Sequence, residues 1–359
     1  MADQLNCTVL GAGLMGRLLA HSLATQGHRV QVHEASGPDG TGAAARVAAS
    51  MLAPLAESAI TETPVVNMGH YSLSRWPELI AQLPEPVFFQ QLGTLMLWHR
   101  QDAQQARMLV DKLHINSQSM PSQTRPQTVD GELLQTLEPE LLGKFQQGLF
   151  LPGEGQLDNR QLLAGLLASL QQQHARIHWN SPMSMEELTR QTSSDTDWVF
   201  DCRGLGARED WSHLRGVRGE VIRLHAPEVH ITRPVRLVHP RYPLYIAPKP
   251  DHVYVIGATE IESDDKTEAS VRSTLELLSA AYSLHSGFAE ARILEINTQL
   301  RPTLKNNLPG IRRLATRCLQ INGLYRHGFL IAPAMLDAIL GLMNDDTSLS
   351  DRFTLIQAN

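Results

Sequence analysis

The segment Val9–Gly16 reads V-L-G-A-G-L-M-G and constrains the fold of this chain more than any other. Its glycines Gly11, Gly13 and Gly16 follow an apolar run and open the helical pattern Leu14–Thr25. In a dinucleotide fold the first glycine permits the tight turn, the second lets a pyrophosphate approach the backbone, and the third lets the helix pack closely on the sheet. The helix N-terminus then stabilises the phosphate charge. The segment therefore predicts a nucleotide-binding unit.

A second strand and an acidic residue complete this unit. Arg29–His33 reads as a strand, and Glu34 at its end can accept hydrogen bonds from the 2′- and 3′-hydroxyls of a ribose. An acid at this place favours NAD or FAD over NADP, whose ribose carries a phosphate. The competing interpretation, a glycine-rich turn in an ordinary α/β protein, leaves Glu34 unexplained.

Composition indicates an enzyme-sized globular protein and argues against two classes of partner. The 359 residues are 42% hydrophobic, enough for a large core in two domains or in one large domain with an insertion. The net charge of −6 and the lack of a long Lys/Arg block argue against nucleic-acid binding. No apolar stretch approaches the ~20 residues of a membrane span, and no charged leader precedes the first strand. We expect a cytoplasmic protein.

The three cysteines, Cys7, Cys202 and Cys318, are isolated and lack CxxC spacing. This pattern argues against both a disulfide framework and a zinc site, so no metal site is predicted. Each cysteine is expected to be a small buried hydrophobic residue.

Patterns along the chain indicate a nucleotide domain assembled from separated segments. The loop Gly37–Gly42 leads into a run of small side chains, Ala43–Pro54, which lets the backbone lie close to a flat or phosphorylated group. Strands at Ile177–Trp179 and Trp198–Cys202 return to this domain, and Arg203–Ala207 is a second glycine turn. The other predicted elements are helices at Val66–Leu83, Asp102–Leu113, Asn159–Gln173 and Ala332–Asn344, a strand or hairpin at Phe88–His99, a loop at His114–Thr128 and a strand at Cys318–Asn322.

Between these segments lie strand patterns at Gly219–Leu224, Leu244–Pro248 and His252–Ala258, followed by a helix at Glu268–Tyr282. They predict an antiparallel sheet in a separate α+β substrate domain. We assign residues 1–83, 145–210 and 296–359 to the nucleotide domain, and residues 84–144 and 211–295 to the substrate domain. The expected fold class is α/β.

Seven segments, in order over nearly the whole chain, carry a resemblance to a known family. They are G-A-G-L-M-G with Glu34, S-M-L-A-P-L-A-E (Ser50–Glu57), R-G-E-V-I (Arg218–Ile222), Y-I-A-P-K (Tyr245–Lys249), I-G-A-T-E (Ile256–Glu260), L-R-P-T-L-K-N-N-L-P (Leu300–Pro309) and G-L-Y-R-H-G-F-L-I-A-P (Gly323–Pro333). The chain resembles the D-amino-acid oxidase-like (DAO) family of FAD-dependent oxidoreductases, most closely its glycine oxidase branch, which is associated with thiamine biosynthesis. The resemblance implies an FAD-binding Rossmann-like domain of the glutathione-reductase type.

The resemblance also implies which residues bind FAD. The loop after the second strand and the small-residue run would wrap the pyrophosphate and the isoalloxazine ring, and a backbone contact near Met183 would hold the adenine. The C-terminal element would place backbone N–H groups near the flavin pyrimidine edge, where negative charge develops on reduction. The expected FAD-binding residues are Gly11, Gly13, Leu14, Met15, Gly16, Glu34, Thr41, Gly42, Arg46, Ala48, Ala49, Ser50, Met51, Met183, Gly204, Tyr325, Arg326, His327, Gly328, Phe329 and Leu330.

The chemistry implied by the resemblance is oxidative deamination of a small amino acid or amine, of the glycine, sarcosine or D-amino-acid type. A hydride passes from the substrate α-carbon to flavin N5, the imine hydrolyses to a keto acid and ammonia, and O₂ reoxidises the flavin and gives H₂O₂. A guanidinium suits the substrate carboxylate because its planar fork donates two parallel hydrogen bonds. Arg301 matches the family's carboxylate-binding arginine, Arg326 a second arginine near the substrate, and Tyr245 a tyrosine whose hydroxyl reaches the same carboxylate.

The residues themselves leave alternatives open for each of these side chains. Arg301 could be a structural arginine paired with an acid, and Tyr245 could be a core residue. Arg46 could pair with Glu34 or Glu57 instead of binding the FAD phosphates.

Alternatives also remain open for the function. One is a flavin dehydrogenase that passes electrons to an acceptor other than O₂, and another is an accessory, non-catalytic flavoprotein. Glu260 stands at a position that is apolar in some glycine oxidases, so if it points inward it would favour a substrate with an extra positive charge. The frequent self-association of the family adds a homo-oligomer to the expected partners.

Overall fold

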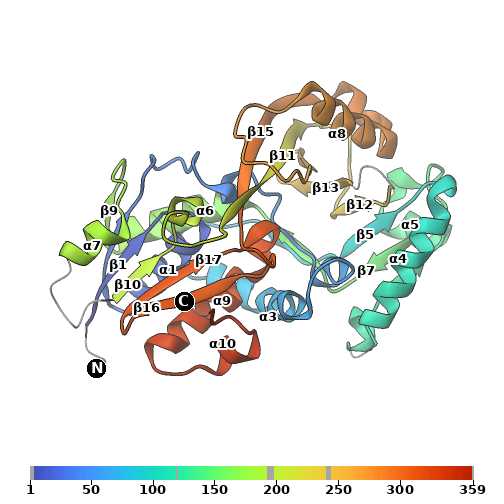
Figure 1. The fold of residues 1–359 in the computed structure, drawn as a ribbon. Helices are drawn as coiled ribbons and strands as arrows, with labels where there is room; N and C mark the ends of the chain where they lie inside the picture. Colours follow the sequence, from blue (N-terminus) through green and yellow to red (C-terminus); the bar gives the residue numbers. More distant parts are fainter. Residues whose placement is uncertain (1–3, 119, 192–197, 240–243, 358–359) are drawn as a thin grey trace.

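The computed structural model describes residues 4–118, 120–191, 198–239 and 244–357, without the side chains of 189–191. Strands gather in two large sheets and one small one. The sheet that contains β1, the strand before the glycine motif, lies on one side of Figure 1 with helix α9. The strands from β11 to β15 lie on the other side beneath α8. The fold is the expected α/β arrangement of a nucleotide domain and a second domain.

The six-stranded sheet is the nucleotide-binding sheet. Its four central strands and β9 run parallel, and β16 is an antiparallel edge strand. The expectation that strands near 177 and 198 return to the first two strands is confirmed by the register, which pairs β9 with β2 and β10 with β1. In order across the sheet the strands are β16 (Gly310–Ala315), β17 (Cys318–Asn322), β10 (Trp198–Asp201), β1 (Asn6–Leu10), β2 (Arg29–His33) and β9 (Arg176–His178).

Helices cover this sheet and share one apolar core with it. Helix α1 contacts both α6 and α9, and α3 and α10 also pack on α9. The core holds Leu18 and Leu19 of α1, Trp76 of α3 and Ile339 of α9, all fully buried. The helix bounds are α1 (Leu14–Thr25), α3 (Thr63–Ile80), α6 (Asn159–Gln172), α9 (Gly328–Met343) and α10 (Ser348–Arg352).

Helix α9 begins at Gly328, four residues before the predicted start at Ala332. The prediction placed Pro333 near the helix N-terminus, where proline is usually tolerated, but Pro333 lies inside the helix. Because proline has no N–H, the carbonyl of Phe329 lacks its usual partner four residues ahead. The indole N–H of Trp76 donates to that carbonyl at 2.9 Å. The partner from α3 allows the helix to continue through Pro333.

The same helix corrects an expectation about apolar stretches. Tyr325–Met343 is 19 residues long and, by length and composition alone, apolar enough to cross a membrane, although no such stretch was expected. In the protein 67% of its apolar window is buried, where α9 packs against α1, α3 and α10. We therefore describe it as a core helix.

The eight-stranded sheet forms most of the second domain. The three strands predicted to be antiparallel are adjacent within it as β11, β14 and β13, and the pairing of β12 with β5 is parallel. Helix α8 (Val271–Leu284) packs on β11, β13 and β14. In order the strands are β15 (Arg292–Thr303), β11 (Arg215–His225), β14 (Val253–Gly257), β13 (Leu244–Lys249), β12 (Val235–Leu237), β5 (Thr94–Leu97), β7 (Gly148–Leu151) and β6 (Gln127–Val129).

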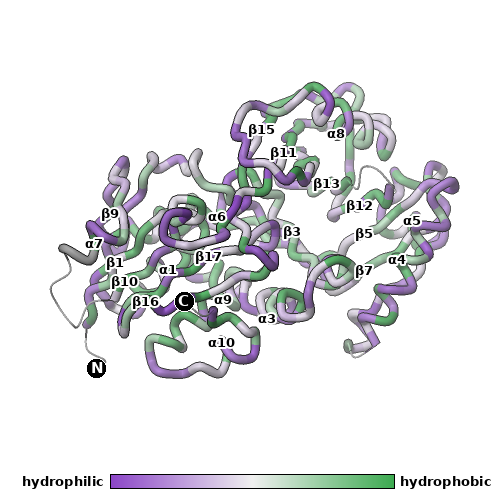
Figure 2. Tube along the Cα trace, viewed as in Figure 1, coloured by the Kyte–Doolittle hydropathy of each residue, from purple (hydrophilic) through white to green (hydrophobic). Residues whose placement is uncertain are grey.

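A small sheet and several short helices connect the two domains. The small sheet holds β3 (Met51–Leu52), β8 (Gly155–Leu157) and β4 (Phe89–Gln90), with β8 in the middle. Hydrophobic and hydrophilic stretches alternate along α4 in Figure 2, in keeping with one face on the protein and one in solvent. The remaining α-helices described are α2 (Pro54–Glu57), α4 (Ala103–Asn116), α5 (Gly131–Leu137) and α7 (Met185–Gln191), and the 3₁₀ turns include η1 (Ala44–Arg46), η5 (Gly204–Ala207) and η7 (Tyr325–His327).

Two details differ from the sequence interpretation. The predicted loop at 114–128 contains the end of α4 and the start of β6. Strand β7 pairs in the eight-stranded sheet although residues 145–210 were assigned to the nucleotide domain, and β15 runs through the predicted boundary at 295/296. The division into domains stays a prediction, and these two strands show where its boundaries need adjustment.

Candidate active site

A large cavity of about 1740 Å³ runs between the nucleotide-binding sheet and the eight-stranded sheet. Ligand pockets usually measure about 300–1,000 Å³, so this cavity has room for a long ligand and for a second compartment. Most of the predicted FAD-binding residues line it, namely Gly11, Gly13, Leu14, Met15, Glu34, Gly42, Ala48, Ala49, Ser50, Met51, Gly204, Tyr325, Arg326, His327, Gly328, Phe329 and Leu330.

The glycine motif has the geometry that its sequence predicts. Gly11 has a φ of +89°, which glycine adopts at little cost, and a Cβ on Gly16 would overlap the carbonyl oxygen of Gly11. Gly13 caps α1 without a side-chain hydrogen bond, and a Cβ on it would meet no protein atom closer than 3.8 Å. The first N–H groups of α1 therefore face open cavity, where a pyrophosphate fits.

Glu34 fixes the end of β2 against the glycine turn. Its Oε2 accepts the backbone N–H of Ala12 at 2.6 Å, and its Oε1 accepts the backbone N–H and the hydroxyl of Ser36. A carboxylate oxygen accepts more than one hydrogen bond, so Glu34 retains acceptor capacity toward the cavity that it lines.

Four predicted FAD-binding residues lie off the cavity wall. Gly16 acts through packing, Thr41 is exposed, and the carbonyl of Met183 accepts a hydrogen bond from Arg203 at 3.2 Å. Arg46 donates to the carbonyl of Asp39, and within the described residues it forms no ion pair with either suggested acid, Glu34 or Glu57. Roles for Thr41, Arg46 and Met183 toward FAD stay predictions.

The small-residue run lies over a buried lysine that the sequence interpretation did not single out. Nζ of Lys249 donates to the carbonyls of Ala49 and Leu157 and to the side-chain oxygen of Gln156. Burial lowers the pKa of Lys249 to about 7. Ser50 has a φ of +50° and donates its hydroxyl to the same Leu157 carbonyl at 2.5 Å. These bonds fix the backbone that the flavin is expected to contact.

One face of the eight-stranded sheet forms the other wall of the cavity. Residues paired directly across a sheet point to the same face. Arg236 pairs with Tyr245, Tyr245 with Gly257, and Gly257 with Val221, so the four form a row across β12, β13, β14 and β11. Pairing of β11 with β15 adds Arg301 to the same face. The register therefore brings two arginines to the same wall as Tyr245.

Two glycines on this face make room for large side chains. A Cβ on Gly257 would lie 2.5 Å from the hydroxyl oxygen of Tyr245, and a Cβ on Gly219 would overlap the guanidinium of Arg301. The Tyr245 ring and the Arg301 guanidinium therefore lie flat over glycine backbone. Burial raises the pKa of Tyr245, and among the described residues its hydroxyl has no hydrogen-bond partner. Its proton is available to a ligand.

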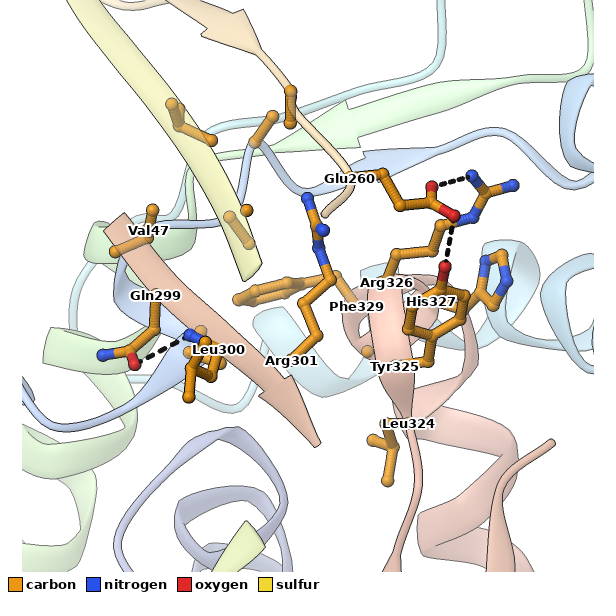
Figure 3. A pocket seen from close by; sticks show the side chains of 18 of the residues that line it. Val47, Glu260, Gln299, Leu300, Arg301, Leu324, Tyr325, Arg326, His327 and Phe329 are labelled. Atoms are coloured by element: carbon orange, nitrogen blue, oxygen red, sulfur yellow. Dashed lines mark hydrogen bonds and ion pairs between the residues drawn. The ribbon is translucent and has the colours of Figure 1, made fainter. Parts of the chain in front are cut away.

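Arg301 forms no ion pair with a described carboxylate, although its charge acts on Glu260 at longer range. Its Nη2 donates to the carbonyl of Thr259 at 3.0 Å, and its Nη1 donates to the carbonyl of Arg218 at 3.3 Å. Figure 3 shows its side chain rising from β15 into the space beside Glu260. The two carbonyls fix the guanidinium, and an anionic ligand in the cavity would supply the missing counter-charge.

Arg326 is held differently, although it lies in the same cavity. Its Nη2 is 2.8 Å from Oε2 of Glu57, and its Nη1 is 2.9 Å from Oε2 of Glu260. The hydroxyl of Tyr325 donates to the other oxygen of Glu260 at 2.5 Å (Figure 3). Both terminal nitrogens of Arg326 are thus ion-paired, so its role toward a substrate carboxylate stays a prediction.

Glu57 links the two walls of the cavity, because it binds Arg236 of β12 and Arg326 of η7. This role was not predicted from the sequence. Oε1 accepts from Nη2 of Arg236 at 2.7 Å while Oε2 binds Arg326. Burial opposes its charge, but Arg236 and Arg326 outweigh burial and lower its pKa to about 2. Burial also lowers the pKa of the neighbouring His327 to about 4. Glu57 is therefore an anion and His327 is neutral at pH 7.

Arg236 is the second residue that the sequence interpretation missed. It stands in the apolar strand β12, nine positions before Tyr245, and a charged residue in such a strand is the signal that was available. The antiparallel pairing of β12 with β13 places it opposite the tyrosine, but only the register shows that both side chains point into the cavity.

Comparisons with known proteins agree with this geometry. A Rhizobium etli protein named as a thiamine biosynthesis oxidoreductase, ThiO, is 38% identical over 91% of this chain and 93% of its own. Glycine oxidase from Bacillus cereus has a similar fold, with a TM-score of 0.80, 19% identity and 99% coverage of both chains. Iminodiacetate oxidase from Chelativorans sp. BNC1 has a TM-score of 0.78 and 19% identity, with 95% of each chain covered.

The open N-terminus of α1, the acid at the end of β2 and the run of small side chains are the features that FAD requires, so the cavity fits this cofactor. Residues 6–338 match the family described as FAD dependent oxidoreductase (DAO). The chain therefore belongs to the DAO family and is an FAD-dependent oxidoreductase of the glycine oxidase type, acting on carbon–nitrogen bonds.

Proposed function

We propose that this enzyme oxidises the α-carbon–nitrogen bond of a small amino acid or amine with a carboxylate, of the glycine, sarcosine or D-amino-acid type. Bound FAD would supply the hydride acceptor, N5 of its ring. The neutral amine gives up a hydride, which carries two electrons and one proton, and then loses a second proton from nitrogen to become an imine. Water converts the imine to a keto acid and releases the amine or ammonia. O₂ takes the two electrons and two protons as H₂O₂.

The observation that carries this proposal is the guanidinium of Arg301 beside the hydroxyl of Tyr245, neither of which is paired with a side chain among the described residues. The two groups lie in the same cavity as the residues expected to bind the flavin. Arg301 would bind the substrate carboxylate through two hydrogen bonds, and Tyr245 would donate a third. Holding the carboxylate fixes the α-carbon, and such positioning is the protein's main contribution when a cofactor performs the chemistry.

The proposed reaction requires no general base, and none is assigned among the described side chains. His327 is neutral at pH 7, but its nitrogens face Thr61 and Glu57. The substrate amine would enter in its neutral form, because a hydride leaves readily only from a carbon whose nitrogen has a lone pair to form the imine. Activity should therefore rise with pH as the bound amine loses its proton.

We further propose a cytoplasmic location and O₂ as the acceptor, with a homo-oligomer as the expected assembly. All three cysteines are free, as expected in a reducing compartment. A flavin dehydrogenase with a different acceptor and an accessory flavoprotein without turnover stay as alternatives.

Oxygen uptake by the FAD-loaded enzyme, measured with glycine, sarcosine and a panel of D-amino acids, tests the proposal. Consumption of O₂ with equal formation of H₂O₂ would support an oxidase. Reduction of a dye without O₂ uptake would indicate a dehydrogenase. If no amino acid or amine reduces either acceptor, the proposed function is wrong.

A further inference from the structure

The cavity wall contains a second cation-bearing position that the proposed function does not use. Arg236 follows Tyr245 in the row of paired residues, on the side away from Arg301. Adjacent strands lie about 4.8 Å apart, so the backbone of Arg236 is roughly 14 Å, or three strand spacings, from that of Val221. Arg301 leans over Gly219 on the same strand as Val221. The Tyr245 hydroxyl therefore stands between two guanidinium groups.

Arg236 has donors to spare. Its Nη2 is bound to Glu57, but its Nε is buried without a hydrogen-bond partner. Among the described residues its Nη1 also has no partner, and the side chain lines the cavity with 18% of its surface exposed. A buried guanidinium with unused N–H groups is costly unless a ligand completes its hydrogen bonds.

The charges around Tyr245 favour an anionic ligand. Three guanidinium groups, those of Arg236, Arg301 and Arg326, face the two carboxylates of Glu57 and Glu260. The buried Glu154 also acts on Arg236, and burial raises its pKa to about 7, so one positive charge is in excess while Glu154 is protonated. Glu260 points into the cavity, but both of its oxygens are engaged by η7. Its charge is therefore directed to η7, and the preference for a cationic substrate expected from its position in the sequence stays a prediction.

We propose that the substrate carries a second carboxylate, bound by Arg236, while Arg301 and Tyr245 bind the first. This inference rests on the proposed amine oxidation and specifies its substrate class as small amines that bear two carboxylates. A second carboxylate adds a negative charge to the substrate, which the surplus of guanidinium groups around Tyr245 favours. The second carboxylate would also satisfy the unused donors of Arg236.

Sarcosine and iminodiacetate form a matched pair for the test, since they share the N-substituted glycine and differ by a methyl against a carboxymethyl group. For the FAD-loaded enzyme we expect kcat/KM to be roughly 10- to 100-fold higher for iminodiacetate, the usual range for a hydrogen bond between charged groups. Equal values, or a preference for sarcosine, would overturn the proposal without a mutation.

Arg236→Gln should lower kcat/KM far more for iminodiacetate than for sarcosine and so remove this preference, because Arg301 and Tyr245 still bind the carboxylate that both substrates share. Arg208→Gln is the matched control. This arginine also lines the cavity, is paired with the exposed Asp264, and its loss should leave the preference intact. An equal loss with both substrates in Arg236→Gln would show a structural role and contradict the proposal. If Arg236→Gln does not retain FAD, Arg236→Lys should show an intermediate preference.

Ligand binding separates failure of this proposal from failure of the proposed function. Malonate and acetate can be titrated into the FAD-loaded enzyme while the flavin absorbance is followed, and neither compound is a substrate. Tighter binding of malonate that is lost in Arg236→Gln would support the second carboxylate position even if no amine is oxidised. Equal affinities for malonate and acetate in the wild-type enzyme would count against it.

Discussion

The two walls of the cavity are built on different principles. The cofactor wall consists mainly of backbone, with glycines and small side chains that follow one another along short segments such as the turn after β1 and the run before α2. The substrate wall consists of long charged side chains from residues far apart in the sequence, including Glu57, Arg236 and Arg326. The first wall depends on local backbone geometry, whereas the second depends on strand register.

This difference predicts that adding one methyl group to the glycine turn reduces stability and FAD binding more than the other substitutions considered below. A Cβ on Gly16 would overlap the carbonyl of Gly11, and backbone on both sides cannot move away. We expect Gly16→Ala to lose more than about 4 kcal/mol of stability and to yield no FAD-loaded protein. Gly13→Ala is the control, because its Cβ would make only an ordinary contact with Ala43 at 3.8 Å. It should fold but bind FAD weakly. Normal FAD content in Gly16→Ala, measured by absorbance, would contradict the packing argument.

On the substrate wall, the largest effect is expected at Arg301. Removal of the guanidinium in Arg301→Ala eliminates a charged partner of the substrate, which typically costs about 2–5 kcal/mol. Steady-state kinetics should show a decrease in kcat/KM of about 10²- to 10³-fold with unchanged FAD content. Arg301→Lys keeps the positive charge but lacks the planar guanidinium, so its kcat/KM should lie between those of the wild type and Arg301→Ala. Wild-type kinetics in Arg301→Ala would remove this residue from the site.

Glu34 is a charged side chain on the cofactor wall, which otherwise consists mainly of backbone, so its removal tests the difference between the two walls. Glu34→Ala should weaken FAD binding by roughly 10- to 100-fold, through loss of charged hydrogen bonds to the ribose and of the bond that fixes the glycine turn. The dissociation constant of FAD, measured by fluorescence during reconstitution, checks this. The kcat at saturating FAD should change little, since the residue lies on the opposite wall from Arg301. Unaltered FAD affinity would contradict the assignment.

The pKa of Glu57 ties the substrate wall to the pH dependence of stability. Its pKa falls from 4.5 to about 2 on folding, because the arginine charges outweigh burial. Its contribution, at most about 3 kcal/mol, is therefore complete above pH 4.5 and is lost as the pH falls toward 2. Urea unfolding of the wild type should show this loss, and Glu57→Gln should show a smaller dependence on pH over that interval. If the unfolding free energies of the two proteins depend on pH equally, Glu57 does not make this contribution to stability.

The sequence predicted the cofactor wall well because its signals are local. The helix Leu14–Thr25 and the strand Arg29–His33 have the predicted bounds. Glu34 follows that strand directly, so its place needed no tertiary information. Helix α9 was misjudged at its start because the partner of its free carbonyl, Trp76, lies more than two hundred residues away.

The substrate wall was less predictable for the same reason. Arg301 and Tyr245 were identified through resemblance to the DAO family. Arg236 was missed because the sequence of β12 does not show that this residue pairs with Tyr245 on the neighbouring strand. Strand β15 was not predicted as one long strand, because its N-terminal half is exposed and mixes apolar with charged residues instead of alternating. Register, edge position and bridging ion pairs are properties of the assembled sheet.

Anaerobic addition of substrate to the purified, FAD-loaded protein tests the central claim most directly. The account predicts a flavin absorption spectrum that bleaches in the absence of O₂ when a small carboxylate-bearing amine such as sarcosine or iminodiacetate is added. Arg301→Ala should have the same spectrum and bleach far more slowly. A protein that holds no flavin, either as purified or after reconstitution with FAD, would contradict the account.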